Sequence, residues 1–568
     1  MSSIAANWLN RSCPVTGLKV DKHAEWLIRV NAVVAVLAFT TGLVGAIMLA
    51  LTRWQAVHLL PADWYYRMVT AHGLNMLVFF IIFFEMAALY FAGPILLNSR
   101  LVGPKLGWVA FVLMVLGTLM VEYTVFTGQA DVMFTSYPPL KAHPYYYLGL
   151  IIFAVGALLV VTLFFASIIV AKKENTYQGS VPLVTFGAIT AAIIAVITIL
   201  HGAIILIPTL LWSFGLIPMD AEIYRLIFWG FGHSSQQINV SAQVAIWYLM
   251  GGLTMGGVVL NEKVSRGAFL LYILFISMAS AHHLLVDPGF GPAWKIVNTS
   301  YFMYLAVLAS LIHGFTVPAG MEVGARLQGY TNGLFEWLQK APWSDPGFSA
   351  TFLSLIIFGF LGGVTGVVIG TEQINIIAHN TLRIPGHFHT TVVGGTALCF
   401  MGATYYVVPL LFRKQILGMA LARIQPYIFA LGITIVGTSM IVAGLFGAPR
   451  RHYDIAFTEA PFQVEFPAAV DLALTFVGIG GIIAFTGGLI YVLVVVASVF
   501  LGPAYDDAAA KSGKASVPQG LLKLPPQVHD KELHDAPGSL VLAFVLLAVF
   551  AVYYFTNWKI LSMIWKVG

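Results

Sequence analysis

Six histidines of this chain lie within or at the edge of long apolar stretches, where a polar side chain is costly to bury unless it serves a function. Two of them, His387 and His389, stand two positions apart in the segment IPGHFHTTVVGG. Residues i and i+2 of a helix point to nearly opposite sides, so this pair can bind the irons of two different hemes on the two flanks of one helix. The others are His72, His233, His282 and His283. A single histidine of this kind is equally well explained by a hydrogen bond between helices, but all six together favour metal binding.

The composition is that of a membrane protein. Of the 568 residues, 59% are hydrophobic and 9% are charged, whereas soluble domains carry about 25% charged residues. About 20 apolar residues span a bilayer, and the chain contains thirteen such stretches. They cover residues 25–52, 64–98, 104–127, 145–171, 181–213, 225–260, 267–287, 296–320, 350–370, 385–412, 424–446, 470–501 and 538–558. We therefore expect an all-α polytopic protein of the lipid bilayer, whose net charge of +5 belongs to its loops and indicates no nucleic-acid partner.

Lysine and arginine are distributed unevenly among the connections between these stretches. If the N-terminus is cytoplasmic, most of the 29 Lys and Arg fall on the cytoplasmic side, as is typical of membrane proteins. Thirteen spans then place the C-terminus on the outer side. The chain divides into a catalytic bundle of twelve spans at residues 1–502, a flexible or loosely packed cytoplasmic linker at 503–537, and a thirteenth transmembrane helix with the C-terminus at 538–568.

Five motifs follow one another in an order that is specific even though each is weak alone. They are TAHGLNML on the second stretch, GH followed four residues later by a polar residue on the sixth, AHHLLVDP after the seventh, HNTLRIPGHFH leading into the tenth, and GAPRRHYD after the eleventh. Together they resemble the catalytic subunit of the heme-copper oxidoreductase superfamily, and the thirteenth helix is most similar to the B-type oxygen reductases. The resemblance implies a twelve-helix oxidase bundle with an accessory thirteenth helix, in the cytoplasmic membrane of a bacterium or archaeon.

The resemblance implies a role for each of the six histidines. His72 and His389 would be the axial ligands of a low-spin heme, and His387 the single protein ligand of a high-spin heme with one open face. A copper ion, or alternatively a non-heme iron, would face that open side, bound by His233, His282 and His283. Imidazole suits both metals, and axial ligation decides whether a heme transfers electrons or binds a ligand. The implied cofactors are two hemes, of undefined type, and one copper or iron.

Two arginines and one further histidine are implied to hold the hemes by their propionates. Arg450 and Arg451 in GAPRRHYD resemble the pair that binds these groups, since guanidinium binds carboxylate in a bidentate manner. His379, in HNTLRIPGHFH, is expected near a propionate on the outer side. The alternative interpretation is a set of solvated loop charges and a surface histidine.

Gln237 marks a departure from the oxygen reductases. In those enzymes the residue four after the first copper-binding histidine is a tyrosine that supplies an electron and a proton, because complete reduction of O₂ takes four electrons. Glutamine has neither accessible redox chemistry nor a proton to release. Reduction of NO (2 NO + 2 e⁻ + 2 H⁺ to N₂O + H₂O) takes two electrons and needs no such donor. The well-known nitric oxide reductases have glutamate here, and this chain resembles a smaller nitric oxide reductase group with glutamine.

We therefore predict a respiratory nitric oxide reductase in which Gln237, with the three histidines of the non-heme metal, forms the catalytic site. A terminal oxygen reductase that reduces O₂ to water and pumps protons is the alternative, in which a displaced tyrosine would replace the missing phenol. Tyr248 lies eleven residues along the same helix, too far to reach the metal, and Tyr224 and Tyr272 qualify only if the fold brings them inward. A non-catalytic heme protein or transporter is disfavoured because all six ligands are present.

Protons for either reaction require a polar route through a dry interior. Ser241 and Tyr248 share a helix face with Gln237, while span eight carries hydroxyl and imidazole groups three residues apart. The predicted path comprises Ser241, Tyr248, Ser310, His313 and Thr316. Ordinary hydrogen bonding between membrane helices is the competing explanation.

Electrons must come from outside this chain. The sequence contains no dinuclear copper motif and no CxxCH heme-attachment motif. We expect a small membrane-anchored subunit II, of cupredoxin or cytochrome type, to pass electrons from cytochrome c or a quinol.

Copper is preferred over iron at the three-histidine site because no carboxylate occupies the position that supports iron in other nitric oxide reductases.

Overall fold

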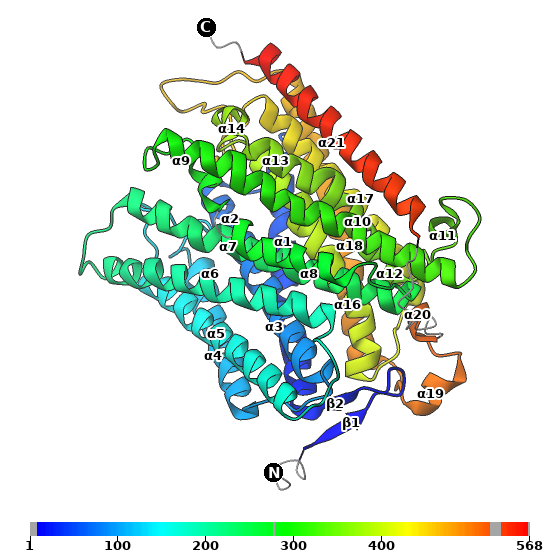
Figure 1. The fold of residues 1–568 in the computed structure, drawn as a ribbon. Helices are drawn as coiled ribbons and strands as arrows, with labels where there is room; N and C mark the ends of the chain where they lie inside the picture. The colour runs from blue at the N-terminus through cyan, green and yellow to red at the C-terminus, as the bar shows by residue number, and fades with distance from the viewer. Residues whose placement is uncertain (1–7, 277–278, 523–534, 566–568) are drawn as a thin grey trace.

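The computed structural model describes residues 8–276, 279–522 and 535–565 and is almost entirely helical (Figure 1). The first half of the bundle contains α1 (Lys22–Arg53), α2 (Ala62–Leu74), η2 (Asn75–Phe80), α3 (Ile81–Tyr90), η3 (Phe91–Ile95), α4 (Pro104–Phe126), α5 (Pro144–Lys173), α6 (Leu183–Ser213) and α7 (Ala221–Met255). The second half contains α8 (Glu262–Leu271), η4 (Tyr272–Ile276), η5 (Ala279–Leu284), α9 (Pro292–Val297), η6 (Asn298–Met303), α10 (Tyr304–Leu327), α12 (Pro346–Ile357), η7 (Phe358–Gly363), α13 (Val364–Gly370), α15 (Arg383–Phe388), η8 (His389–Ala397), α16 (Leu398–Val407), η9 (Val408–Phe412), α17 (Met419–Leu445), α18 (Ala468–Leu501) and α21 (Pro537–Ile564). Connecting elements are the antiparallel strands β1 (Asn10–Ser12) and β2 (Lys19–Asp21) and the helices α11 (Glu336–Gln339), α14 (Glu372–Ala378), α19 (Asp507–Ser512) and α20 (Gln519–Leu522).

Within these described residues, eleven helices are long and apolar enough to cross a membrane. The two expected spans that are not among them lie at 225–260 and 267–287. The first is the continuous helix α7, which carries the polar run GHSSQQINVS and is therefore less apolar than its neighbours. The second is divided into α8, η4 and η5 around positions 277–278, which lie outside the described residues. The first segment carries His233 and the second carries His282 and His283, which are three of the predicted metal ligands.

Helix α7 is delimited by local signals at both ends. The side chain of Asp220 accepts a hydrogen bond from the backbone N–H of Ile223 at 2.8 Å, which caps the first turn. The helix ends at Gly256, whose φ of 67° is a left-handed conformation that glycine adopts without strain. The 35 residues between these signals are long enough to carry site residues through the bundle.

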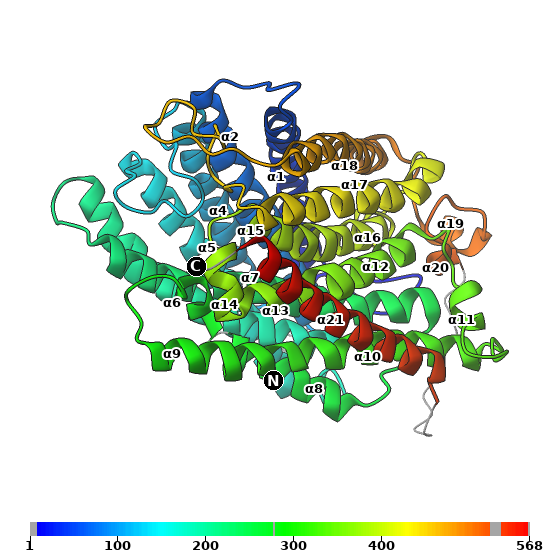
Figure 2. The same cartoon turned by 90° about the horizontal axis from the view of Figure 1, so that it is seen from above.

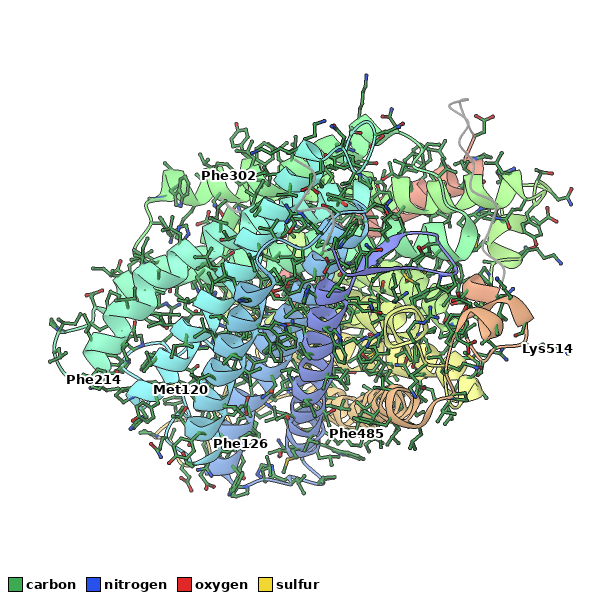
Figure 3. The ribbon with its side chains drawn as sticks, turned by 90° about the horizontal axis from the view of Figure 1, so that it is seen from below. Met120, Phe126, Phe214, Phe302, Phe485 and Lys514 are labelled. Carbon is green, nitrogen blue, oxygen red and sulfur yellow. The ribbon has the colours of Figure 1, made fainter. Side chains whose placement is uncertain are left out.

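Neighbouring helices approach closely where glycine replaces a larger side chain. At the contact of α4 with α5, a Cβ on Gly117 would collide with the carbonyl oxygen of Gly149. Small residues allow this backbone contact, which is typical of membrane bundles. Large apolar side chains also lie on the outside, where Phe126 and Phe214 are exposed at the periphery (Figure 3). The exposed apolar surface fits a lipid environment.

The predicted flexible linker at 503–537 is wrong for its first part. Tyr505, Val517 and Leu521 are buried, and the backbone N–H of Gly520 donates to the buried carboxylate of Asp345 at 3.0 Å. These few apolar groups in an Asp-, Lys- and Ala-rich segment pack under the end of the bundle, which composition alone does not indicate. Residues 523–534 of the linker lie outside the described residues.

The thirteenth helix, α21, packs across α10 and α13 on the surface of the bundle (Figure 2). At its N-terminus the buried carboxylate of Glu322 accepts hydrogen bonds from the backbone N–H groups of Gly538 at 3.1 Å and Ser539 at 2.6 Å. Near its other end Arg383 Nη2 donates to Asn557 Oδ1 in a buried contact. Polar contacts thus attach α21 at both ends, although most of its surface is exposed.

We predict that Asn557→Leu destabilises the protein by about 1–3 kcal/mol, because the buried Arg383 guanidinium loses its acceptor. Thermal unfolding of the purified complex measures the effect. Val552→Ala on the exposed face of the same helix is the matched control and should leave the unfolding temperature unchanged. Equal stability of the Asn557→Leu and Val552→Ala proteins would show that the Arg383–Asn557 contact contributes nothing.

Candidate heme and metal centres

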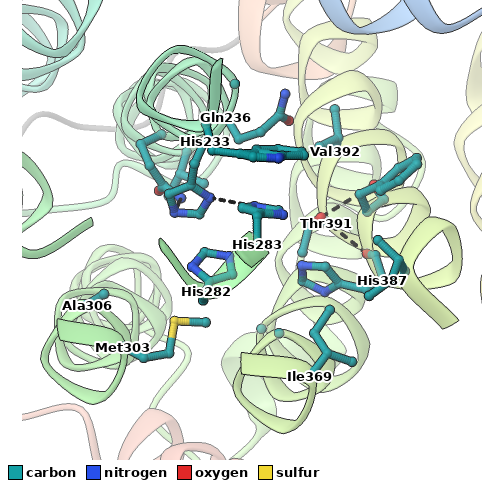
Figure 4. A pocket seen from close by; sticks show the side chains of 18 of the residues that line it. His233, Gln236, His282, His283, Met303, Ala306, Ile369, His387, Thr391 and Val392 are labelled. Carbon is teal, nitrogen blue, oxygen red and sulfur yellow. Dashed lines mark hydrogen bonds between the residues drawn. The ribbon is translucent and has the colours of Figure 1, made fainter. Parts of the chain in front are cut away.

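Three of the predicted histidines come together from two elements. His233 projects from α7, and His282 and His283 project from η5 (Figure 4). One ligand nitrogen of each lies within 4.8 Å of the others, and His233 Nδ1 lies 3.1 Å from His283 Nε2. Two imidazole nitrogens at this distance need a proton or a metal ion between them, because their lone pairs repel. The donor set fits copper or iron with a further coordination position left open.

The amide of Gln237 contacts the outer nitrogen of His233. Gln237 Nε2 lies 3.1 Å from His233 Nε2, and Gln237 Oε1 is buried without a partner among the described residues. If Nδ1 of His233 binds a metal, its Nε2 must carry the proton and donate. Rotation of the amide then turns Oε1 toward that N–H and satisfies both groups. Such an acceptor behind a ligating imidazole fixes its tautomer and orientation.

His72 and His389 face each other across a gap suited to a single metal ion. Their ring centroids are 6.1 Å apart, and the ring planes differ by 15°. The Nδ1 atom of His72 lies 2.9 Å from the carbonyl oxygen of Gly42, and that of His389 lies 2.7 Å from the carbonyl of Pro385. These bonds place the ring proton on Nδ1 and leave each Nε2 free as a ligand, at about 2 Å from a bound metal. The geometry fits bis-histidine ligation.

His387 enters a different cavity from His389, as their spacing predicts. His387 lines a cavity with His233, His282 and His283, whereas His389 lines a second cavity with His72. The Nδ1 atom of His387 lies 3.0 Å from the carbonyl oxygen of Gly362 and 3.0 Å from the hydroxyl of Thr365. Its Nε2 is thereby directed into the first cavity, where it is the ligand available to a heme.

The two cavities share part of their lining. Their volumes are about 190 Å³ and about 200 Å³. Leu77, Phe134, Phe388 and Arg450 line both of them. A planar group in each cavity, held by the histidines described above, would therefore lie close to its neighbour, as electron transfer between two hemes requires.

Arg450, Arg451 and His379 gather at one edge of the cavities, and among the described residues neither arginine forms an ion pair with a carboxylate. Arg450 donates to Asn380 Oδ1 at 2.9 Å, but its Nε has no partner among the described residues, and neither does Nε2 of His379. Arg451 lies over the ring of Tyr137 at 5.1 Å. Burial, followed by the neighbouring Arg451, lowers the pKa of Arg450 to about 9. Burial, followed by Arg450, lowers the pKa of His379 to about 3. Unused donors and uncompensated charge at this edge fit the carboxylates of two hemes.

Three residues of the site were not predicted. Arg225 and Trp229 lie on α7, where Arg225 pairs with Asp287 at 2.8 Å and Trp229 stacks on His283 with centroids 3.7 Å apart. Buried Arg53, at the end of α1, lines the second cavity and donates to the carbonyl oxygen of Arg450 at 2.7 Å. The sequence could have indicated Arg225 and Trp229. They precede His233 and Gln237 at intervals of four residues, and residues at this spacing lie along one face of a helix. Arg53 resembles an ordinary helix-terminal arginine in the sequence.

Some residues of the predicted proton path are hydrogen-bonded to one another, and the path itself stays a prediction. Tyr248 Oη lies 2.7 Å from the hydroxyl of Thr316 and 3.0 Å from His313 Nδ1, and it donates to Ser265 Oγ at 3.1 Å. Ser310 lines the first cavity and contacts the hydroxyl of Tyr272 at 3.2 Å.

Ser241 does not belong to this cluster, which corrects the prediction. Its hydroxyl faces α6, where it donates to the carbonyl oxygen of Gly187 at 3.1 Å. Tyr272 and Ser265, which were not predicted to belong to the path, are members of the cluster instead.

Comparison with known proteins agrees with this geometry. The family model described as cytochrome c and quinol oxidase polypeptide I matches residues 27–483. Cytochrome c oxidase subunit 1 of Thermus thermophilus is 31% identical over 444 residues, which are 76% of each chain. Ubiquinol oxidase subunit 1 of Acetobacter aceti is 24% identical over 458 residues, covering 74% of this chain and 64% of the relative. The cryo-EM structure of a heme-copper terminal oxidase dimer matches with a TM-score of 0.81 and 27% identity, covering 95% of this chain and 92% of that chain.

The chain belongs to the heme-copper oxidase subunit I family. The resemblance inferred from the motifs and the expected helical bundle are thereby confirmed. Membership makes the chain a multi-pass membrane oxidoreductase of respiratory electron transport and implies hemes and a copper or other metal centre. The nitric oxide reductase subgroup, the individual residue roles and the orientation in the membrane stay predictions.

We predict that His387→Ala removes the high-spin heme and retains a bis-histidine low-spin spectrum, whereas His389→Ala does the reverse. The reason is that the two side chains enter different cavities. Optical spectra and heme content of the purified complex measure both outcomes, and His23→Ala, at an exposed position of α1, is the control. Retention of both hemes in either variant would contradict the assignment.

We predict that His282→Ala abolishes turnover while both hemes remain, because one of three ligands of the non-heme metal is lost. Metal analysis should show that metal depleted relative to heme. The same result is expected for His233→Ala and His283→Ala. Normal turnover in a protein that lacks the metal would rule out a role for it in the reaction.

Proposed function

We propose that this heme-copper oxidase homologue is a respiratory nitric oxide reductase that converts two NO, two electrons and two protons into N₂O and water. The observation that carries the proposal is Gln237 beside His233, at the position where the oxygen reductases of this family have their redox tyrosine. An amide supplies neither an electron nor a proton. The two-electron reaction needs neither from the protein.

The positions of the tyrosines support this proposal. Among the described residues that line the first cavity, Tyr137 is the one tyrosine, and it lies between Arg225 and Arg451 at the cationic edge. Tyr248 and Tyr272 are hydrogen-bonded within the cluster on the side of α10. Tyr224 contacts Ser136 and the carbonyl oxygen of Thr135 instead. None of these phenols takes the place of a tyrosine at position 237.

Reduction of O₂ is the second candidate. The relatives named above are a cytochrome c oxidase and a ubiquinol oxidase, and this observation favours the oxygen reductase reading. In that case one of the tyrosines on the α10 side would have to supply the fourth electron.

The residues of the first cavity have different roles in the proposed reaction. A heme and a non-heme metal bound here would supply electrons and open coordination positions for the two substrate molecules. The protein holds their ligands: His387 on one side and His233, His282 and His283 on the other. Gln237 orients His233 through its outer nitrogen. The apolar side chains of Leu77, Val240, Phe358 and Val392 exclude bulk water from the reacting molecules.

Protons can reach this cavity from the side of α10. Ser310 lines the cavity, and His313 and Thr316 follow it along one helix face. The Tyr248 hydroxyl connects His313 with Thr316, and Tyr272 contacts Ser310. Hydroxyl and imidazole groups both donate and accept, so the cluster can pass protons inward as the reaction consumes them.

The electron donor and the non-heme metal follow from the family and the donor set. The relatives named above take electrons from cytochrome c or ubiquinol, as their names state. We propose one of these donors here, acting through a membrane-anchored subunit II of cupredoxin or cytochrome type. The metal cluster formed by the described residues contains three histidines and no carboxylate, which favours copper over iron.

We predict that Gln237→Ala lowers NO reduction by about 10–100-fold, because His233 loses the partner that orients it. Gln237→Glu should retain part of the activity, since a carboxylate oxygen can accept the same hydrogen bond. N₂O production from NO by the purified complex measures both. Full activity of Gln237→Ala would exclude a positioning role for this residue.

The decisive comparison is made on the unmodified enzyme. Rates of NO reduction and O₂ reduction should be measured with the same electron donor. Sustained reduction of O₂ to water at a rate well above that of NO reduction would overturn the proposed function and establish the second candidate.

A further inference from the structure

Glu85 is a buried carboxyl group in the middle of the second span, outside both cavities that contain the histidines. It lies on α3 with 3% of its surface exposed, and it faces α7. Ionisable side chains inside a membrane span are rare and indicate a function unless shown otherwise. The proton cluster and the heme ligands do not include it. Its partner is the amide of Asn239 on α7, which donates to Glu85 Oε1 at 2.9 Å and to the carbonyl oxygen of Ser235 at 3.2 Å.

Asn239 connects Glu85 with a residue of the first cavity. The amide of Asn239 has two terminal atoms, and one of them points at Glu85. The other lies 3.5 Å from Oε1 of Gln236, which is three residues earlier on α7. With the Asn239 nitrogen directed at Glu85, its oxygen faces Oε1 of Gln236. The Gln236 amide must then turn as well, so that one of its N–H groups donates to the Asn239 oxygen. Glu85, Asn239 and Gln236 therefore form a polar series that runs from α3 across α7 to the cavity wall.

Gln236 ends this series at the first cavity. It lines the cavity beside Val392 in a largely apolar wall (Figure 4). Its side chain is only half-buried, and its accessible surface faces the cavity. Its Oε1 lies 3.5 Å from the terminal amide atom of Asn239 that points away from Glu85. An amide has two N–H groups, so when one donates to Asn239 the other remains available to a molecule in the cavity.

We propose that Gln236 is a ligand-binding residue that donates a hydrogen bond to the oxygen end of a diatomic ligand in the first cavity, and that Glu85 and Asn239 orient it. Such a donor stabilises a ligand that gains negative charge on oxygen as it accepts electrons. Glu85 is a positioning residue, because its carboxyl group holds one orientation of the Asn239 amide. The inference goes beyond the choice between NO and O₂, since both present an oxygen atom.

Carbon monoxide bound to the reduced, purified complex is a suitable probe, because its infrared C–O stretching band responds to hydrogen-bond donors nearby. Gln236→Leu should shift this band to higher frequency, since it removes a donor. Glu85→Leu should produce a second band near the position seen for Gln236→Leu, because the Asn239 amide is then free to turn. Glu85→Gln can still accept from Asn239 and should restore both the band and the turnover of the unmodified enzyme.

Glu122 offers a matched control. It is another glutamate within a span, on α4, and it accepts a hydrogen bond from Asn75 at 2.7 Å without belonging to the series. Glu122→Leu should leave the C–O band unchanged. Where Gln236→Leu fails to assemble with its hemes, Gln236→Asn serves instead, because its shorter amide withdraws from the ligand and should also raise the frequency.

Two outcomes would overturn the proposal. An unchanged C–O band in a heme-loaded Gln236 variant would show that its amide does not reach the ligand. In the second outcome, Glu85→Gln loses as much turnover as Glu85→Leu, and the C–O band is unchanged in both variants. Glu85 would then be a proton donor and not a positioning residue. Because the probe does not depend on the substrate, either result leaves the test of NO against O₂ reduction unaffected.

Discussion

Burial of the histidines inside the bundle is the constraint on which the site depends. Each imidazole there must find a hydrogen-bond partner for one nitrogen while the other stays free to bind a metal. Backbone carbonyl oxygens supply this partner for His72, His389 and His387. A carbonyl oxygen has two lone pairs, so it can accept from the imidazole in addition to its own helix bond. The same contacts that remove the penalty of burial thereby also direct Nε2 of each ligand into its cavity.

Helix α7 concentrates the polar groups that this chemistry needs. One face of the helix carries Arg225, Trp229, His233 and Gln237 at intervals of four residues. Arg225 lies at the cationic edge and Trp229 stacks on His283. His233 belongs to the candidate metal site, and Gln237 contacts its outer nitrogen. Asn239 lies toward α3 and meets Glu85 there. A helix with polar groups on two sides cannot face lipid, and α6, α3 and α10 accordingly pack around it. The position of α7 in the bundle thus follows from the residues that it carries.

The sequence was sufficient for the bundle and for the separation of His387 from His389, because hydropathy and helical periodicity are local properties. The roles of the six histidines came from the resemblance to a known family and stay predictions. It was not sufficient where long-range packing decides. Ser241 shares a helix face with Gln237 in a simple projection, yet its hydroxyl bonds to a carbonyl of α6. Arg53 is remote from every motif and reaches the second cavity only through the arrangement of α1 beside the loop of Arg450. The packed residues of the 503–537 linker, such as Leu521, likewise depend on a surface formed by distant helices.

A neutral amide at position 237 is physically suited to this site in a way that its two alternatives are not. A glutamate there would bring a negative charge into a cavity whose metal cluster, among the described residues, contains imidazoles alone, and would have to be neutralised by the metal. A tyrosine would add redox chemistry that the proposed two-electron reaction does not use. Glutamine contacts His233 and carries no charge, and it has no phenol for four-electron chemistry. Under the proposed function, the reaction of this family member is therefore set by the chemistry of the site and not by the fold.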